Sequence, residues 1–408
     1  MTPATLFEQA KALDALGDLT GAVRLYRAAA ANDPGDFRAL NNLGLALEAQ
    51  GDAEGAEASF RSGLAVAPDA APIAFNLGRH RHLAGWLDEA ESLYRRAIAC
   101  DPEMAGAHFN LGRLLEERPR AMPAGEAEAA GREAEAVACY RRSVELDPGG
   151  AAPREGLARA LHACGRPDEA IASLHAWLAR EPEHALARHL LASLGGAEAP
   201  ARAPDAYVRA TFDRLAADFD RTLARLDYRA PRLCAEMLAT IAGEPAGTLR
   251  VLDAGCGTGL CGALLKPWSR TLEGIDLSAA MLEQARERLV YDALTEAELT
   301  AWLAVHAAHW DAIVSADTIC YLGALEPALA AAFAALAPAG VLVFTLERGD
   351  DAAAYRLRAS GRYAHAEGHV QAAVAAAGFG DVRMQRETLR MEGGAAVEGL
   401  VVSGRRPL

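Results

Sequence analysis

The sequence of 408 residues predicts an all-helical superhelical repeat array followed by an α/β domain with a doubly wound parallel sheet. In the first half, small residues and proline recur with a period of 34 residues. In the second half, short apolar runs alternate with helical stretches. Residues 195–204 between them are rich in glycine, alanine and proline and have no periodicity. We therefore expect domains at 1–195 and 206–408, joined by a linker at 196–205.

The repeat is clearest in its prolines, which follow one another at steps of 34, 34, 46 and 34 residues: Pro34, Pro68, Pro102, Pro148 and Pro182. A glycine, an alanine and an aromatic residue recur with nearly the same steps. Glycine permits a tight turn, alanine lets two helices approach closely, and proline starts a new helix. Each unit is therefore predicted to be a helical hairpin. The longer fourth step, near residues 118–131, predicts a loop inserted between the two helices, with Gly131 as the turn glycine.

This pattern resembles the tetratricopeptide repeat, whose units stack into a superhelix with a concave groove. The resemblance implies five repeats, and the segment after Pro182 fits a terminal capping helix. One asparagine recurs on the first helix of three repeats: Asn42, Asn76 and Asn110. Because that helix lines the concave face of such arrays, these amides are expected to hold the backbone of a bound peptide or protein. The alternative is that asparagine serves only local hydrogen bonding here.

Composition excludes several classes of function. The formal net charge is −14, and an acidic surface repels phosphate backbones, so no nucleic-acid partner is expected. No apolar run reaches the ~18 residues that a membrane span needs. The first residues lack the pattern of a secretory signal. Seven cysteines occur without a CxxC pair or zinc spacing, which predicts reduced thiols in the cytoplasm and no metal site.

The second half opens on a glycine-rich turn. Residues 250–260, RVLDAGCGTGL, read as a strand, a turn and the start of a helix, and the turn holds three glycines: Gly255, Gly257 and Gly259. A dinucleotide fingerprint would have a fourth glycine where this chain has Leu260. Asp253 suits a ligand with an ammonium and a sulfonium, such as S-adenosylmethionine, better than a pyrophosphate. Asp276 ends the second strand and is placed to accept hydrogen bonds from ribose hydroxyls.

Residues 253–259 resemble the first motif of class I S-adenosylmethionine-dependent methyltransferases, and residues 274–281 resemble their second. The segments YVRATFDRLAADFD, VYDALTEAEL, SADTICYLGAL, GRYAH and LRMEGGAAVEG are similar to a bacterial family of such enzymes that carry tetratricopeptide repeats. The resemblance covers residues 207 to about 405. It implies S-adenosylmethionine as the cofactor and S-adenosylhomocysteine as the product.

The resemblance also implies roles for single residues around the cofactor. The turn residues Gly255, Cys256, Gly257 and Gly259 would line its methionine part. Asp253 would orient the turn or bind the ammonium, and Asp276 would bind the ribose. The adenine would lie against two apolar side chains and one acid: Leu277, Met281 and Glu298.

Candidate catalytic residues follow the fourth and fifth strands, whose carboxyl ends lie near the switch point of such a sheet. Asp317 and Tyr321 follow the fourth strand, and Tyr321 is expected to contact substrate. Glu347 ends the fifth strand, and Tyr363 and His365 come after it as a wall or lid. His365 would be the general base if one is needed, since imidazole titrates near neutrality. A carboxylate acceptor needs no base, whereas an alcohol or an amine does.

Three functions are compatible with these features. The first is a methyltransferase that acts on a peptide or protein captured by the repeat groove. The second is a small-molecule methyltransferase, acting on a natural product or metabolite, whose repeats bind a partner or mediate oligomerisation. The third is a scaffold that senses S-adenosylmethionine without catalysis. Intact Asp253, turn glycines and Asp276 argue against the third.

Overall fold

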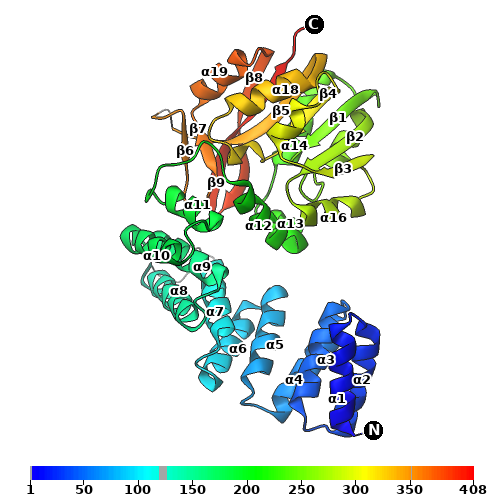
Figure 1. Cartoon of the computed structure of the whole chain (residues 1–408), viewed down its shortest axis with the longest axis vertical. Helices are drawn as coiled ribbons and strands as arrows, with labels where there is room; N and C mark the ends of the chain where they lie inside the picture. Colours follow the sequence, from blue (N-terminus) through cyan, green and yellow to red (C-terminus); the bar gives the residue numbers. More distant parts are fainter. Residues whose placement is uncertain (1, 119–125, 351) are drawn as a thin grey trace. The chain divides into compact units, whose positions relative to one another are not determined.

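The computed structural model describes residues 2–118, 126–350 and 352–408 (Figure 1). The chain divides into two compact units, Met1–Ser173 and Leu174–Leu408, which are described in turn. Within the described residues, no helix is both long enough and apolar enough to cross a membrane.

The first unit is a series of helical hairpins, as predicted. The pairs are α1 (Pro3–Ala15) with α2 (Leu19–Asn32), α3 (Phe37–Ala49) with α4 (Ala53–Val66), α5 (Ala71–Leu83) with α6 (Leu87–Cys100), and α7 (Ala105–Glu117) with α8 (Glu126–Leu146). Helices α9 (Ala151–Ala163) and α10 (Pro167–Arg180) follow along the chain. Aspartates cap several helix starts; Asp18, for example, accepts the Gly21 amide. The glycines between paired helices, such as Gly17 and Gly51, have φ near +80°, which glycine adopts without strain.

The fourth repeat differs from the prediction. Residues 119–125 of the expected loop lie outside the described residues. Helix α8 begins at Glu126, so the second part of that segment is helical and Gly131 lies within the helix. Gly131 therefore does not form the turn that its spacing suggested. The signal was misleading because glycine is tolerated inside a helix at a cost of only about 1 kcal/mol.

Close packing inside each hairpin depends on a second set of glycines. A methyl group added at Gly44 would lie 2.5 Å from the ring of Phe60, which is fully buried. The corresponding distance at Gly78 is 3.0 Å to Tyr94, and at Gly112 it is 3.1 Å to Tyr140. The aromatic ring of one helix thus lies directly on the backbone of the other. A larger residue at these positions would separate the two helices.

We predict that Gly44→Ala lowers the free energy of unfolding by about 1–3 kcal/mol, because the buried Phe60 ring cannot move aside. The matched control is Gly131→Ala, which adds a methyl group that meets nothing within 4 Å. That change should be neutral or stabilise the helix by up to about 1 kcal/mol. Urea denaturation of the two variants measures the difference. Equal effects would show that Gly44 is not held in close contact.

The second unit is built on a sheet of nine strands in the order β3-β2-β1-β4-β5-β7-β6, with β9 antiparallel to β5 and β8 antiparallel to β9. The strands are β1 (Leu249–Ala254), β2 (Ser269–Asp276), β3 (Ala293–Glu296), β4 (Trp310–Ser315), β5 (Leu336–Arg348), β6 (Tyr355–Leu357), β7 (Tyr363–His365), β8 (Gly380–Glu392) and β9 (Ala395–Arg405). Strands β1 to β5 pair in parallel. The predicted doubly wound sheet is confirmed. Strands β8 and β9 form a hairpin that turns at Gly393 and Gly394.

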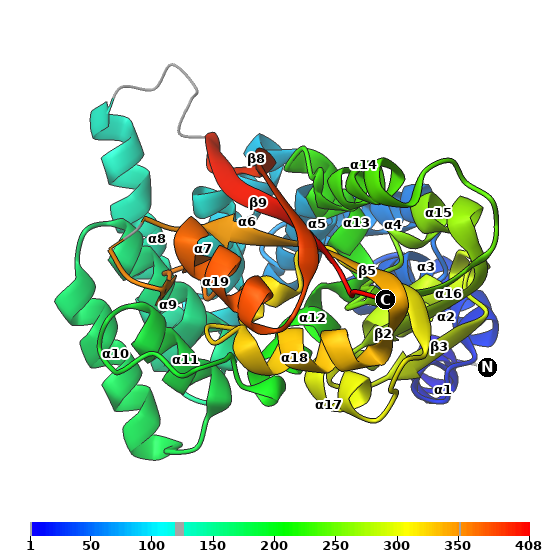
Figure 2. The same cartoon turned by 90° about the horizontal axis from the view of Figure 1, so that it is seen from above.

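Helices cover both faces of this sheet (Figure 2). Helix α14 (Ala230–Ala242) packs on the face that presents Val251 and Val343. Helices α18 (Glu326–Ala335) and α19 (Glu367–Ala376) pack on the opposite face, which presents Leu252 and Phe344. The chain changes direction between β1 and β4, whose carboxyl ends therefore open a crevice at the switch point.

Helix α11 (Ala185–Ser193) and the segment after it pack on this second unit. The His189 imidazole donates a hydrogen bond from Nε2 to the Gly361 carbonyl at 2.9 Å and stacks on Tyr207 with ring centroids 4.1 Å apart. The Tyr363 hydroxyl donates to the Pro200 carbonyl at 2.7 Å. These contacts group α11 with the sheet. The domain boundary expected at residue 195 stays a prediction.

Candidate active site

The turn after β1 requires its glycines. Gly255, Gly257 and Gly259 have φ values of 78°, 54° and 85°, in the left-handed region that favours glycine. A methyl group on Gly255 would lie 2.1 Å from the Thr318 hydroxyl, so that position admits no side chain. At Gly257 the nearest atom would be 3.9 Å away, in the Phe219 ring. The turn is therefore packed at Gly255 and open at Gly257, where a ligand can approach the backbone.

Asp276 holds this turn from the end of β2. Its Oδ2 accepts the Gly257 amide and its Oδ1 accepts the Ser278 amide, both at 2.9 Å. Burial raises the pKa of Asp276, and the amides of Ser278, Gly257 and Leu277 oppose that shift by stabilising the carboxylate. Each oxygen retains a further lone pair for a ligand hydroxyl.

Asp253 lies beneath the same turn and is 1% exposed. Its Oδ2 accepts a hydrogen bond from the Tyr291 hydroxyl at 2.6 Å. Its Oδ1 is buried without a hydrogen-bond partner among the described residues. Burial raises the pKa of Asp253 to about 7; the Tyr291 bond opposes the rise and the charge of Asp276 adds to it. A buried carboxylate with a spare oxygen is expected to gain a donor or a cation when a ligand binds.

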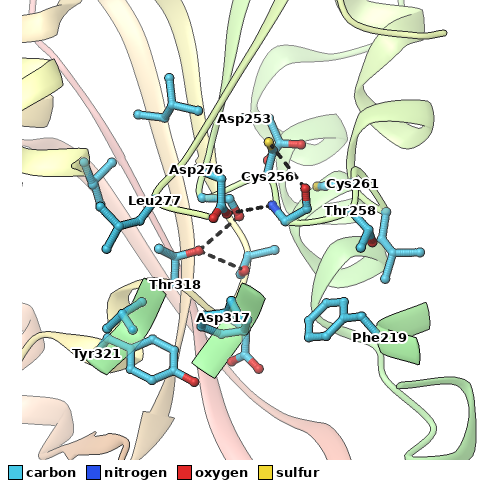
Figure 3. A pocket seen from close by; sticks show the side chains of 18 of the residues that line it. Phe219, Asp253, Cys256, Thr258, Cys261, Asp276, Leu277, Asp317, Thr318 and Tyr321 are labelled. Carbon is cyan, nitrogen blue, oxygen red and sulfur yellow. Dashed lines mark hydrogen bonds between the residues drawn. The ribbon is translucent and has the colours of Figure 1, made fainter. Parts of the chain in front are cut away.

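A cavity runs from this turn to the residues that follow β4 and to Arg362 and Arg390. Its empty space, together with the open solvent at its mouth, is about 1290 Å³. Figure 3 shows Asp253, Cys256 and Asp276 around the turn, with Asp317, Thr318 and Tyr321 beside it and Phe219 across the view from Tyr321. The walls are mostly apolar and aromatic, and a few polar groups converge on the interior, as is typical of small-molecule sites.

The segment 205–225 covers the turn. It comprises α12 (Asp205–Leu215), a short 3-10 turn and α13 (Phe219–Arg225). The Thr258 hydroxyl donates to Asp220, and the Ser278 hydroxyl donates to Asp213, each at 2.5 Å. The rings of Phe212 and Phe219, 5.9 Å apart, line the cavity beneath it.

The far end of the cavity holds a buried ion cluster centred on Arg390, which is 2% exposed. Its Nη1 donates to Asp317 and its Nε donates to Glu392, both at 2.7 Å, and its Nη2 donates to Glu347. Arg362 also donates to Glu347, at 2.7 Å, and to Glu392. Burial raises the pKa of Asp317, against the opposing charges of Arg390 and Arg362. Each carboxylate thus lies beside a guanidinium.

Sequence reasoning missed both arginines. Arg390 follows Leu389 in β8, and both side chains are buried, because the pairing with β9 shifts register between Thr388 and Arg390. A regular strand would have directed one of these two side chains to solvent. The sequence contained one signal of the buried arginine: Arg390 directly follows Leu389 in a strand near the glycine pair 393–394. That signal indicates a bulge only when the pairing of β8 with β9 is known.

Nine of the predicted site residues line the cavity: Asp253, Gly255, Cys256, Gly257, Asp276, Leu277, Glu298, Asp317 and Tyr321. Gly259 faces Tyr291 and Arg288, and Met281 is fully buried; both lie behind the lining. Glu298 caps α17 (Leu299–Ala304), where it accepts the amides of Thr300 and Ala301. Burial would raise the pKa of Glu298, but these amides outweigh it and lower the pKa.

Three predicted catalytic residues do not line the cavity. His365 is fully buried, and its Nε2 donates to the Gly323 carbonyl at 3.1 Å. Burial lowers the pKa of His365 to about 4, so the imidazole is neutral. Tyr363 bonds to the Pro200 carbonyl, and Glu347 belongs to the ion cluster. The reason is the pairing of β7 with the end of β5, which buries residues 363–365. His365, Tyr363 and Glu347 therefore lie behind the cavity wall and do not face its interior.

The three asparagines of the first unit form hydrogen bonds within the array. Asn76 Nδ2 donates to Asn41 Oδ1 at 2.8 Å. Asn42 Nδ2 donates to the Tyr26 hydroxyl at 3.5 Å, and Asn110 Nδ2 donates to the Gly106 carbonyl at 3.1 Å. These are the contacts expected if asparagine serves local hydrogen bonding. Peptide binding by these residues stays a prediction.

Family models match both halves of the chain. The model described as "Methyltransferase domain" matches residues 224–377, and those described as "Tetratricopeptide repeat" match residues 7–72, 49–105, 84–151 and 127–194. The chain combines tetratricopeptide repeats with a class I methyltransferase domain. The glycine turn lies within the residues that the methyltransferase model matches, whereas the cavity is also lined by residues outside them, among them Phe212, Phe219 and Arg390.

Relatives share parts of this chain. "Methyltransferase-like protein 27" of Homo sapiens is 42% identical over 85 residues, 21% of this chain and 35% of that protein. "Trans-aconitate 2-methyltransferase" of Paracidovorax citrulli is 35% identical over 125 residues, 30% of this chain and 47% of that protein. This chain therefore spans less than half the length of either. The crystal structure of Burkholderia thailandensis 1,6-didemethyltoxoflavin-N1-methyltransferase matches with a TM-score of 0.41 and 22% identity, over 52% of this chain and 94% of that one.

We predict that Arg390→Met lowers the free energy of unfolding of the methyltransferase domain by about 3–5 kcal/mol, because buried carboxylates lose their cation. Arg386→Met is the matched control on the same strand: Arg386 is 65% exposed and pairs only with Glu367 among the described residues. Its loss should cost less than about 1 kcal/mol. Urea denaturation followed by circular dichroism compares the two. A small effect at both positions would contradict the role given to the cluster.

Proposed function

We propose that this chain is an S-adenosylmethionine-dependent methyltransferase. The observation that carries the proposal is the pair of carboxylates at the glycine turn. Asp253 offers a buried oxygen without a partner, and Asp276 braces the open side of the turn at Gly257. One carboxylate suits an ammonium, and the other suits vicinal hydroxyls. S-adenosylmethionine carries both an ammonium and vicinal ribose hydroxyls.

The residues present fit this cofactor. Asp253, Gly255 and Gly257 would hold its methionine part, and Asp276 would hold the ribose. Leu277 and Glu298, which also line the cavity, would lie beside the adenine. When bound, the cofactor supplies a methyl group activated by the adjacent sulfonium. The chain's own contribution is to orient the acceptor along the carbon–sulfur axis and to exclude water beneath the aromatic segment 205–225.

The acceptor has two candidate sources. Repeat arrays commonly bind extended peptides, so capture of a peptide or protein by the first unit would raise its effective concentration at the methyltransferase domain. The alternative is a small molecule, with repeats that bind a partner or mediate oligomerisation. The internal hydrogen bonds of Asn42, Asn76 and Asn110 favour this alternative, as does the small-molecule acceptor in the name of one relative.

Calorimetry with S-adenosylhomocysteine tests the cofactor site. Asp276→Ala should weaken binding by about 10- to 100-fold, which corresponds to roughly 1–3 kcal/mol for lost charged hydrogen bonds. Asp381→Ala, a change at an 81% exposed aspartate of the same domain, should leave affinity unchanged. Equal affinities in the two variants would place the cofactor elsewhere, and no binding by the unaltered chain would refute the proposed function.

The affinity should also depend on pH through Asp253. An ammonium binds the ionised carboxylate, and the pKa of Asp253 in the unliganded chain is about 7. Affinity for S-adenosylhomocysteine should therefore be full above pH 7 and fall by up to about tenfold per pH unit between pH 7 and pH 5.

Asp253→Asn is the control for this dependence. The variant should bind more weakly at pH 8 and lose most of the change between pH 8 and pH 5, since its side chain does not titrate. A wild-type affinity that is constant over this range, or a variant that retains the full dependence, would contradict the placement of the ammonium at Asp253.

A further inference from the structure

The end of the cavity opposite the glycine turn has its own polar groups. Asp317 follows β4 with φ of 58°, and its amide donates to the Thr345 hydroxyl oxygen at 2.8 Å. This conformation is uncommon for a residue with a side chain, although aspartate and asparagine tolerate it best. The hydrogen bond to Thr345 thus holds the backbone of Asp317 in a strained conformation. This conformation fixes the direction of the Asp317 carboxylate. Such strain is frequent at functional sites.

The two oxygens of Asp317 differ. Oδ2 accepts from Arg390 Nη1 at 2.7 Å, whereas Oδ1 is buried and has no hydrogen-bond partner within the described ranges. The side chain is 14% exposed and lines the cavity. Arg390 therefore fixes one oxygen of the carboxylate and leaves the other to be satisfied by a donor that the folded chain does not provide.

Two phenol groups also line the cavity, and both lie close enough to Asp317 for its charge to act on them. Tyr228 and Tyr321 line the cavity, and neither hydroxyl has a hydrogen-bond partner in the part of the chain that the structure describes. Burial raises the pKa of both hydroxyls above the usual value of 10, so both keep their protons at neutral pH. The Tyr321 ring is held edge-on against Phe212 at 5.5 Å. The wall thus offers two neutral donors beside one carboxylate acceptor.

The charges behind this wall bear on the acceptor. The cluster contains three carboxylates, Asp317, Glu347 and Glu392, and the guanidinium groups of Arg390, which is buried, and Arg362, which is 20% exposed. Arg358 lies 3.7 Å from Glu347 and adds a third guanidinium at the edge of the cluster, where it is 43% exposed. Glu392 is 36% exposed, and the three carboxylates and three guanidinium groups balance one another in the cluster. A carboxylate acceptor would add a fourth negative charge here and would meet no uncompensated cation.

We propose that the acceptor group is a hydroxyl or an amine whose proton passes to Asp317, with Tyr228 and Tyr321 binding the polar atoms next to it. This inference rests on the proposed function. In the transfer, the lone pair of the acceptor oxygen or nitrogen forms the bond to the methyl carbon. The carbon–sulfur bond breaks with its electron pair going to sulfur, and the acceptor N–H or O–H proton goes to the Asp317 carboxylate. Methyl ether or methylamine products follow, not methyl esters.

The test uses the full chain with methyl-labelled S-adenosylmethionine and an extract of the source cells, separated into a polypeptide and a small-molecule fraction. Labelled products are then treated with mild alkali, which hydrolyses methyl esters to volatile methanol and leaves methyl ethers and methylamines intact. We expect label that resists alkali, and the fraction that contains it distinguishes a polypeptide acceptor from a metabolite. Release of labelled methanol would overturn the inference.

Asp317→Asn tests the assigned residue, since asparagine tolerates the same backbone conformation but does not accept the proton. The variant should bind S-adenosylhomocysteine within about threefold of wild type and transfer label at least about 100-fold more slowly. Asp311→Asn, at the other end of β4 and paired with Arg250, is the matched control and should transfer normally. Unchanged transfer in Asp317→Asn would overturn the inference. If the wild-type protein binds S-adenosylhomocysteine but transfers no label, the acceptor assignment alone is overturned. If the wild-type protein does not bind S-adenosylhomocysteine, the proposed function is refuted.

Discussion

The hydrogen bond from the Gly257 amide to the Asp276 carboxylate, 2.9 Å long, connects the two strands on which the cavity depends. It forms because β1 and β2 pair in parallel and end side by side, with Ala254 opposite Ile275. The backbone after β1 then turns through three glycines with positive φ instead of continuing as a strand. Asp253 and Asp276 consequently face one crevice. Any change that moved the β2 end would displace both the turn and the carboxylate that supports it.

The opposite end of the crevice is held by electrostatics more than by backbone pairing. Arg390 is buried and contacts three carboxylates: one that follows β4, one in β5 and one in β8. Burying these charges costs desolvation energy, so the cluster as a whole adds little net stability to the fold. Its main effect is to fix the orientation of the carboxylates. Asp317 is the member that also lines the cavity. Proton transfer requires the accepting group to be held at a fixed position beside the ligand, and Asp317 is held in this way.

Sequence reasoning identified the parts that local pattern determines. The 34-residue period, the β1 turn, Asp253 and Asp276 could be predicted because each needs particular residue types at short spacing. The ion cluster could not, since Arg390 meets Asp317 across 73 residues and through a bulge in β8. His365 was misplaced for a related reason: the short strand β7 gives no clear signal, yet its pairing with β5 buries the imidazole. Gly131 followed the repeat spacing but lies inside α8, where local helix formation outweighed the periodic pattern.

The central claim is that the glycine turn, the end of β2 and the segment 205–225 form one cofactor site. Hydrogen–deuterium exchange of the full chain, with and without saturating S-adenosylhomocysteine, tests it most directly. The account predicts added protection at residues 254–260, at 276–281 and in the segment 205–225, because ligand binding suppresses local opening where it makes contact. Protection confined to other regions, or a ligand effect that leaves the glycine turn unchanged, would contradict the account.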